Sequence, residues 1–186
     1  MTHLFPIPSP LPEGWRVVTA RTQAECDAAF AVRCSEDTIL VIEPRESIDA
    51  KIGSVLFGNR GGLGSINGES VRFYGIRWLI VQGGESPCHP DWVRSLRDQA
   101  QVAGVPFWFA GWGAWVPVNK GGEERLNNGV PLGPEFEEMI CLSPTGEQLQ
   151  VVGGEANYMM VPVGSSRSGR LLDGWEWSQV PEELQR

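Results

Sequence analysis

The chain has 186 residues and a formal net charge of −8, with 41% hydrophobic and 20% charged residues. This composition excludes a disordered chain, because it supplies enough apolar side chain for the core of one domain. No apolar run approaches the ~18 residues of a membrane-spanning helix, and residues 1–15 lack the basic start and apolar stretch of a secretory signal. We therefore expect a soluble protein of the cytoplasm with no membrane contact.

The charge is unevenly distributed and argues against binding to nucleic acid. Residues 1–118 carry 12 acidic and 10 basic side chains, whereas residues 119–186 carry 11 and 5. An acidic chain repels phosphate backbones, so we expect no direct contact with DNA or RNA. The 4 cysteines and 2 histidines are too widely spaced for a tetrahedral metal site. The sequence therefore predicts free thiols, no metal and no cofactor.

The first elements in chain order are a leader, a strand and a helix. Prolines interrupt residues 1–14, which predicts an extended, exposed leader. Residues 15–20 are typical of a short strand. Thr22, followed by a glutamate three residues later, forms a capping-box pattern that predicts a helix through about Arg33.

Two apolar runs indicate strands that are buried on both faces. Residues 38–43 and 77–84 have strand length and little alternation, which is typical of a parallel sheet. Between them, the glycine-rich residues 53–70 are expected to form a mobile loop. Pro90 and Gly104 bound a helix with an apolar stripe, which Ser86 or His89 is expected to cap.

A fourth strand at residues 105–112 completes the alternation of strands and helices. This order predicts an α/β fold for residues 15–118, a half TIM-barrel-like parallel sheet of about four strands with covering helices. The acidic residues 119–186 are expected to add antiparallel β structure, namely a hairpin about residues 143–146 and a further strand at 157–163.

Three stretches carry a family resemblance: VVTARTQAECDAAFAVR with ILVIEP, WLIVQGGES with HPDWVRSLRDQAQVAGVPFWFAGWGAW, and GRLLDGWEWSQVP. Together they resemble a phage-encoded family of unknown function, itself similar to radical S-adenosylmethionine enzymes with TIM-barrel-like folds. The resemblance covers about residues 15–49, 76–115 and 167–181. It implies a barrel-like parallel sheet, as the strand and helix pattern also does.

The chain departs from this family at two places that matter for chemistry. Members carry a cysteine triad for an iron–sulfur cluster in an N-terminal half, and no such triad precedes Trp15. Polar family positions near the last strand are Ala110, Gly111 and Ala114 here. We therefore expect a half-barrel without the cluster and without the polar mouth of the family's barrel.

Residues at the ends of two predicted parallel strands form one candidate binding site. Glu43 and Glu85 would lie at the sheet edge where such folds bind ligands, and two carboxylates there suit acid–base work or a metal. Pairing with local arginines is the favoured alternative. Gly83 and Gly84 could offer backbone amides to an anion, although tight turning is their commoner use.

Two further motifs suggest a catalytic pair and an aromatic binding patch. Cys88 beside His89 suggests a nucleophile and base, which we disfavour because neighbouring side chains rarely face each other. Trp108, Trp112 and Trp115 form an aromatic run, with residues 108 and 112 expected on one face of the strand. They are either core residues or an exposed patch that binds a protein partner.

These features leave three functions open. The favoured one is a non-catalytic phage or mobile-element accessory protein that binds a host or phage protein complex, for instance an inhibitor of a bacterial immune complex of the CRISPR type. The alternatives are half of a radical S-adenosylmethionine-like enzyme, completed by a separate iron–sulfur chain, and a small-molecule binder at the strand ends. Because residues 105–118 carry no charge, we also expect a homodimer through this strand, inside the host bacterial cell.

Overall fold

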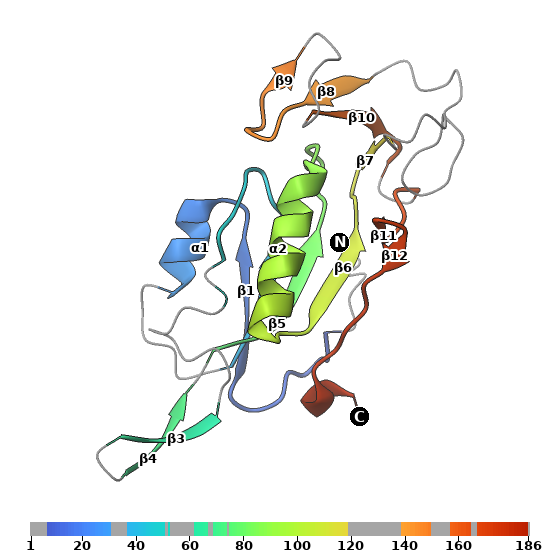
Figure 1. Ribbon diagram of the computed structural model, residues 1–186. Coiled ribbons are helices and arrows are strands. Elements are labelled where there is room, and N and C mark those ends of the chain that lie inside the picture. The colour runs from blue at the N-terminus through green and yellow to red at the C-terminus, as the bar shows by residue number, and fades with distance from the viewer. Residues whose placement is uncertain are drawn as a thin grey trace.

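The computed structural model describes residues 7–30, 37–50, 52, 62–66, 69–73, 75–118, 139–149, 157–164 and 167–185. The predicted parallel sheet is confirmed. Its four strands are all parallel and lie side by side in the order β1-β2-β5-β6, with helices α1 and α2 on one face (Figure 1). The elements are β1 (Trp15–Ala20), α1 (Gln23–Phe30), β2 (Asp37–Ile42), β5 (Ile76–Gln82), α2 (Pro90–Ala103) and β6 (Phe107–Gly111).

Both helices begin at the caps that the sequence indicates. His89 caps α2, its Nδ1 accepting a hydrogen bond from the Asp91 amide at 3.2 Å, and Gly104 ends the helix with a φ of 66°. The Thr22 hydroxyl accepts from the Glu25 amide at 3.2 Å, while the Glu25 carboxylate accepts from the backbone amide of Arg21.

Within the described residues, no helix is both long and apolar enough to span a bilayer.

The sheet is buried on both faces, which explains why its strands are apolar without alternation. The helix face packs Leu40, Ile42, Leu79, Val81, Phe107 and Phe109 against α2 residues Trp92, Val93, Leu96 and Ala100. The opposite face, called the back face below, consists of Ile39, Val41, Trp78, Ile80 and the partly buried Trp108.

The leader and the end of the described chain cover this back face. Ile7 and Leu11 pack against it from the N-terminal side, and Val180 and Leu184 pack against it from the C-terminal side. The expectation of an exposed leader is therefore wrong for Ile7 and Leu11, because burying their side chains covers apolar sheet surface. Leu184 belongs to a short 3-10 helix, η2 (Glu182–Leu184).

A second, antiparallel sheet lies beyond the C-terminal ends of β5 and β6 (Figure 1). Its strand order is β7-β10-β8-β9, and its strands are β7 (Trp115–Pro117), β8 (Ile140–Leu142), β9 (Gln148–Leu149) and β10 (Tyr158–Pro162). The hairpin β8–β9 and the strand β10 confirm the predicted antiparallel addition. Strand β7 was not predicted, because its residues read as the continuation of β6.

Two further hairpins correct the sequence-based expectations. Strands β3 (Gly62–Ile66) and β4 (Glu69–Phe73) pair antiparallel, where a loop over 53–70 was expected. The first part of that loop, residues 53–61, lies outside the described residues. Strands β11 (Leu171–Leu172) and β12 (Trp175–Glu176) form a hairpin that the sequence reading did not anticipate.

The outer edge of β6 is occupied by the chain itself. The Phe109 amide donates to the Trp177 carbonyl at 2.9 Å, the Gln179 amide donates to the Phe107 carbonyl at 3.1 Å, and Trp108 and Ser178 form an antiparallel bridge. These bonds satisfy backbone groups that an edge strand would otherwise expose. The homodimer stays a prediction, but pairing through β6 would first require displacement of residues 177–179.

Candidate protein-binding site

The two strand-end carboxylates lie in different surroundings. The Glu43 carboxylate follows β2 and lies 3.5 Å from Arg21 Nε and 3.9 Å from Arg45 Nη2. Glu85 is exposed, and its backbone carbonyl accepts a hydrogen bond from the Trp115 indole at 3.0 Å. Glu43 thus has the local arginine partners of the alternative reading, which accounts for its position without acid–base chemistry.

The glycine pair after β5 serves close backbone packing. A Cβ atom on Gly83 would lie 1.8 Å from the Trp112 carbonyl oxygen, and one on Gly84 would lie 2.2 Å from the Glu43 carboxylate. The Gly84 carbonyl accepts from the Ala114 amide at 2.8 Å. The absence of side chains at residues 83 and 84 therefore lets the end of β5 touch the turn that follows β6.

Cys88 and His89 do not form a nucleophile–base pair. The Cys88 thiol is buried, and burial together with the negative charge of Glu43 raises its pKa well above the ordinary value. His89 Nδ1 accepts the capping bond from Asp91, and the His89 ring packs edge-on against Tyr158 at 5.1 Å between centroids. Both residues connect α2 to its surroundings.

The three tryptophans near β6 occupy three different environments. Trp108 packs on the back face, edge-on to Trp78 at 6.1 Å between centroids. Trp112 is fully buried in the helix-face core, where its indole donates to the Leu171 carbonyl at 2.9 Å. Trp115 is partly buried above Glu85. The expectation that residues 108 and 112 share a face is wrong, because the strand ends at Gly111, whose φ is 137°.

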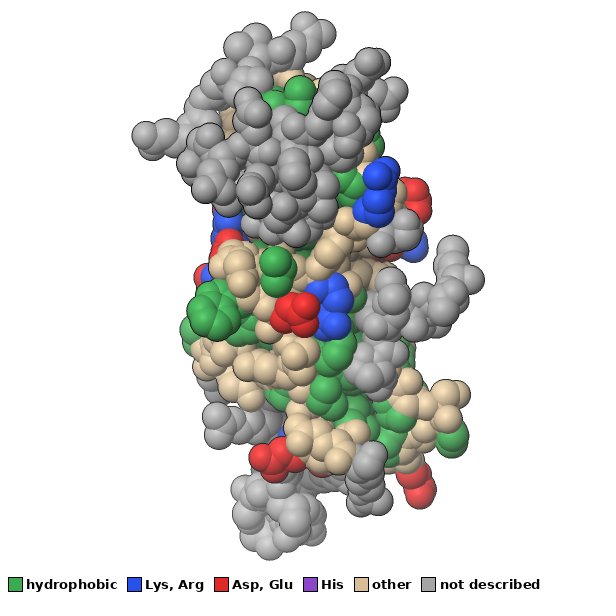
Figure 2. All heavy atoms as spheres, turned by 90° about the vertical axis from the view of Figure 1, so that its right-hand side faces the viewer, with side chains coloured by type: hydrophobic (Ala, Val, Ile, Leu, Met, Phe, Trp, Pro, Cys, Tyr) green, Lys and Arg blue, Asp and Glu red, His purple; other side chains and the backbone are tan. Residues whose placement is uncertain are grey.

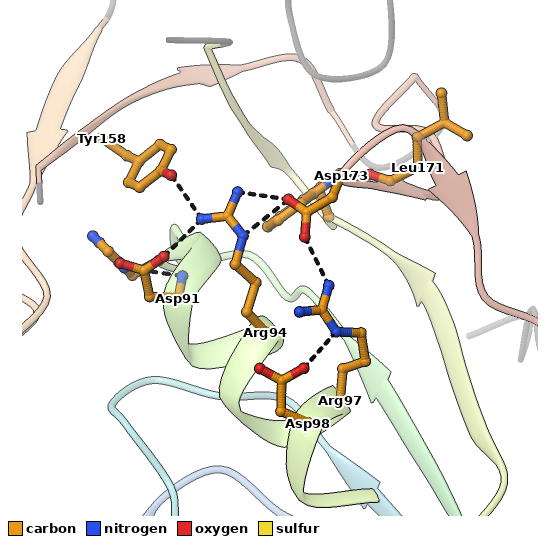
Figure 3. Close-up of polar contacts among 9 residues, drawn as sticks. Asp91, Arg94, Arg97, Asp98, Tyr158, Leu171 and Asp173 are labelled. Atoms are coloured by element: carbon orange, nitrogen blue, oxygen red, sulfur yellow. Dashed lines mark hydrogen bonds and ion pairs between the residues drawn. The ribbon is translucent and has the colours of Figure 1, made fainter. Parts of the chain in front are cut away.

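An ion-pair network holds the hairpin β11–β12 onto helix α2 (Figure 3). Arg94 donates to Asp173 through Nε at 2.9 Å and Nη2 at 2.6 Å, and Arg97 donates to the same carboxylate at 2.7 Å. Arg94 also donates to Asp91 and to the Tyr158 hydroxyl, both at 2.6 Å. We call these five residues the Asp173 network. Both bonds from Arg94 to Asp173 go to Oδ1 and the Arg97 bond goes to Oδ2, so charge-assisted bonds connect α2, β10 and the hairpin.

The Asp173 network has a predictable pH dependence. Burial of the Asp173 carboxyl would raise its pKa, but hydrogen bonds from Arg94 and Arg97 and their charges lower it below the usual value. A group with a lowered folded-state pKa stabilises the protein above its unfolded pKa of about 4, and this contribution is lost as the pH falls through the folded-state value. At pH 7 the network therefore contributes its full stabilisation.

We expect Asp173→Asn to lower the free energy of unfolding at pH 7 by about 1 kcal/mol, a value reduced for solvent screening. The carboxylate is 34% exposed, and asparagine tolerates the positive φ of 55° at this position. The difference from the wild type should be the same at pH 7 and pH 5 and should shrink as the pH falls below about 4, as urea denaturation at pH 7, 5 and 3 would measure. Asp98→Asn is the comparison variant: that carboxylate also accepts from Arg97, at 2.8 Å, but it is 64% exposed, so a smaller loss is expected. A constant difference across this pH range would contradict the assignment.

The hairpin presents an exposed aromatic side chain. Asp173 and Gly174 form its two-residue turn, both with positive φ, as a type I′ turn requires. Trp175 begins the outgoing strand and is 73% exposed. It lines a shallow groove of about 550 Å³ with Glu176, Trp177, Ser178 and Gln179. We call these five residues the Trp175 surface.

The Trp175 surface belongs to the side of the molecule on which β6, β12 and the following residues run. Figure 2 shows that apolar side chains reach the surface on this side among polar ones. Two residues after Trp175, Trp177 packs edge-on against Phe107 at 5.8 Å between centroids, and the Arg97 guanidinium lies 5.4 Å from its ring. The segment that follows Trp175 is therefore packed against the fold, and ordered segments of this kind bind partners with little entropy loss.

Sequence reasoning missed this surface although a signal for it was present. Asp-Gly in a two-residue turn is a strong short-range hairpin signal, and LLDGWE contains it after an apolar pair and before Trp175. A two-residue turn at Asp173 and Gly174 predicts that Trp175 pairs with Leu172 across the hairpin, and the structure has this pairing. No local signal indicates which of the two side chains is buried.

The described residues contain no cluster of side chains that could coordinate a metal ion. No three His, Cys, Asp or Glu side chains there lie close enough together to hold a metal ion. Cys26, Cys88 and Cys141 are buried. Cys34 lies outside the described residues.

The fold and these contacts define an α/β protein with an open parallel sheet, an antiparallel sheet beyond its C-terminal edge and an exposed aromatic hairpin. Residues 42–181 match the family described as proteins of unknown function (DUF5131), and the chain belongs to this family. The comparisons with curated proteins and with solved structures gave no match.

Proposed function

We propose that this chain is a non-catalytic accessory protein of a phage or mobile element that binds a protein complex in the host cytoplasm. The observation that carries the binding role is Trp175, 73% exposed on a hairpin that the Asp173 network fixes. Large exposed aromatic side chains on rigid supports supply much of the binding energy at protein interfaces. The phage setting rests on the family resemblance of the three quoted stretches.

The charge around the Trp175 surface favours a basic partner. Residues 171–185 contain four acidic residues and no basic one. Asp173 pairs with Arg94 and Arg97 and Glu183 pairs with Arg77, while Glu176 and Glu182 are exposed and add negative charge. Such a segment complements a groove lined by lysine and arginine, and opposite charge accelerates association and selects among partners. A groove that normally holds nucleic acid has this chemistry, so inhibition of a nucleic-acid-targeting immune complex of the CRISPR type is the form of binding that we propose.

The contacts at β6 favour this function over the completed half-enzyme. Joining a second half-barrel would need a free edge on β6 for strand pairing. That edge already bonds to residues 177–179 through Phe107 and Phe109. The back face, which would line the barrel interior, is covered by Ile7, Leu11, Val180 and Leu184. A completing chain would have to displace all of these contacts.

The test compares protein partners captured by the wild type and by Trp175→Ala. We expect a host protein complex to bind the wild type and to lose at least about tenfold in affinity with the variant, as for an interface hot spot. Val102→Ala is the matched control, since Val102 is 90% exposed on α2 and lies outside the Trp175 surface. A partner that binds both variants equally would contradict the proposed surface. A captured chain that brings stoichiometric iron and cleaves S-adenosylmethionine would support the enzyme alternative instead.

A further inference from the structure

Trp108 and two side chains that pack against its ring each carry a buried N–H group with no hydrogen-bond acceptor among the described residues. The three donors are Trp78 Nε1, Trp108 Nε1 and Arg170 Nη2. The two indole rings meet edge-on at 6.1 Å, and the Arg170 guanidinium carbon lies 4.5 Å from the centre of the Trp108 ring. These side chains come from β5, β6 and the segment before β11, and they meet on the back face.

Such a group of donors is costly without a ligand. Buried donors are nearly always paired in folded proteins, because leaving one unpaired forfeits its bonds to water. Trp78 is fully buried, so its indole cannot recover that bond from bulk solvent. Three such donors on Trp108 and the two side chains packed against its ring therefore favour a ligand that supplies acceptor atoms.

The chemistry of the donors selects an anion. The arginine carries a fixed positive charge, and the indoles are donors only, so the group offers no acceptor to a cation. Arg170 is held in place because its Nε donates to the Phe109 carbonyl at 3.3 Å. The buried Asp37 also belongs to the parallel sheet, but it lies on β2, two strands away from Trp108.

We propose that the back face binds a small oxyanion, a carboxylate or phosphate group, beside Trp108. Arg170 Nη2 supplies the charged hydrogen bond, and the indoles of Trp108 and Trp78 supply neutral ones. Arg170 as a whole is only partly buried, whereas its Nη2 is buried. This site shares no residue with the Trp175 surface, but Trp108 pairs through its backbone with Ser178 of that surface.

Calorimetric titration with sodium phosphate and with sodium acetate, at matched ionic strength in chloride, tests the proposal. We expect saturable binding of at least one anion by the full chain, and the two titrations distinguish phosphate from carboxylate. Arg170→Gln should weaken binding at least about tenfold, the loss typical of a charge-assisted hydrogen bond. Trp108→Phe, which keeps an aromatic ring under Arg170 but removes the N–H, should weaken it by a smaller factor.

Arg167→Gln is the matched control. It removes the same charge three residues before Arg170, and the Arg167 side chain donates to the Val163 carbonyl, whereas Arg170 lies over the Trp108 ring. The affinity of this variant should equal that of the wild type. The anion should also raise the thermal midpoint of the wild type more than that of Arg170→Gln, since a ligand stabilises the state that binds it. Absence of saturable binding of both anions to the wild type would overturn the proposal, and so would equal binding by Arg170→Gln.

Discussion

Gly83→Ala is expected to lower the free energy of unfolding by about 3 kcal/mol or more, an effect at the upper end of overpacking. The added Cβ would lie 1.8 Å from the Trp112 carbonyl oxygen, 2.1 Å from its carbonyl carbon and 2.8 Å from the Gly113 amide nitrogen. All three are backbone atoms, so relief requires the turn after β6 to move away from the end of β5. That movement would also strain the bond from the Ala114 amide to the Gly84 carbonyl.

The neighbouring Gly84→Ala is the matched control. Its Cβ would meet the Glu43 carboxylate at 2.2 Å, which is the mobile end of a side chain. We therefore expect a cost of about 1 kcal/mol or less for this variant. Urea denaturation of both variants measures the difference. Equal stability of the two would show that the backbones of residues 83 and 112 do not approach as closely as the structure has them.

The parallel sheet and α2 could be predicted because their signals are local. Residues 38–43 and 77–82 are apolar without alternation, which is what burial on both faces requires. Pro90 and Gly104 bound α2 through backbone preferences that need no tertiary contact. Each of these signals is contained within about one element of sequence.

The positions of Trp108, Trp112 and Trp115 could not be predicted from the sequence, because they depend on a single backbone angle at Gly111. Alternation along one strand places residues 108 and 112 together, but the chain turns at Gly111 with a φ of 137°. After that turn, Trp112 enters the helix-face core and Trp115 starts a strand of the second sheet. Glycine permits many conformations, so its presence alone does not specify this turn.

The candidate sites depend on pairings between distant residues. Arg94 and Asp173 are 79 residues apart, and nothing in the sequence around either one indicates the other. Glu43 was expected at a strand end with local arginines as its favoured partners, and the structure pairs it with Arg21 and Arg45. Sequence patterns therefore located charged residues at the sheet edge, whereas their roles required the three-dimensional contacts.

Trp112→Ala is expected to destabilise the protein by about 3–5 kcal/mol, the usual cost of removing a buried tryptophan side chain. Trp112 is fully buried and packs edge-on against Phe109 at 5.0 Å between centroids. The substitution also removes the indole that donates to the Leu171 carbonyl at 2.9 Å, so that the hairpin β11–β12 loses a contact with the core. We expect a lower urea midpoint and a hairpin that is more easily cleaved by protease.

Trp175→Ala should have the opposite profile, with stability within about 0.5 kcal/mol of the wild type, because Trp175 is 73% exposed. Urea midpoints for both variants, measured beside their affinity for the captured partner, separate the two roles. A stable Trp112→Ala protein that fails to bind the partner would place residue 112 at the interface and contradict its burial. An unstable Trp175→Ala protein would show that its side chain packs in the fold, and the Trp175 surface would then lose its proposed role in binding.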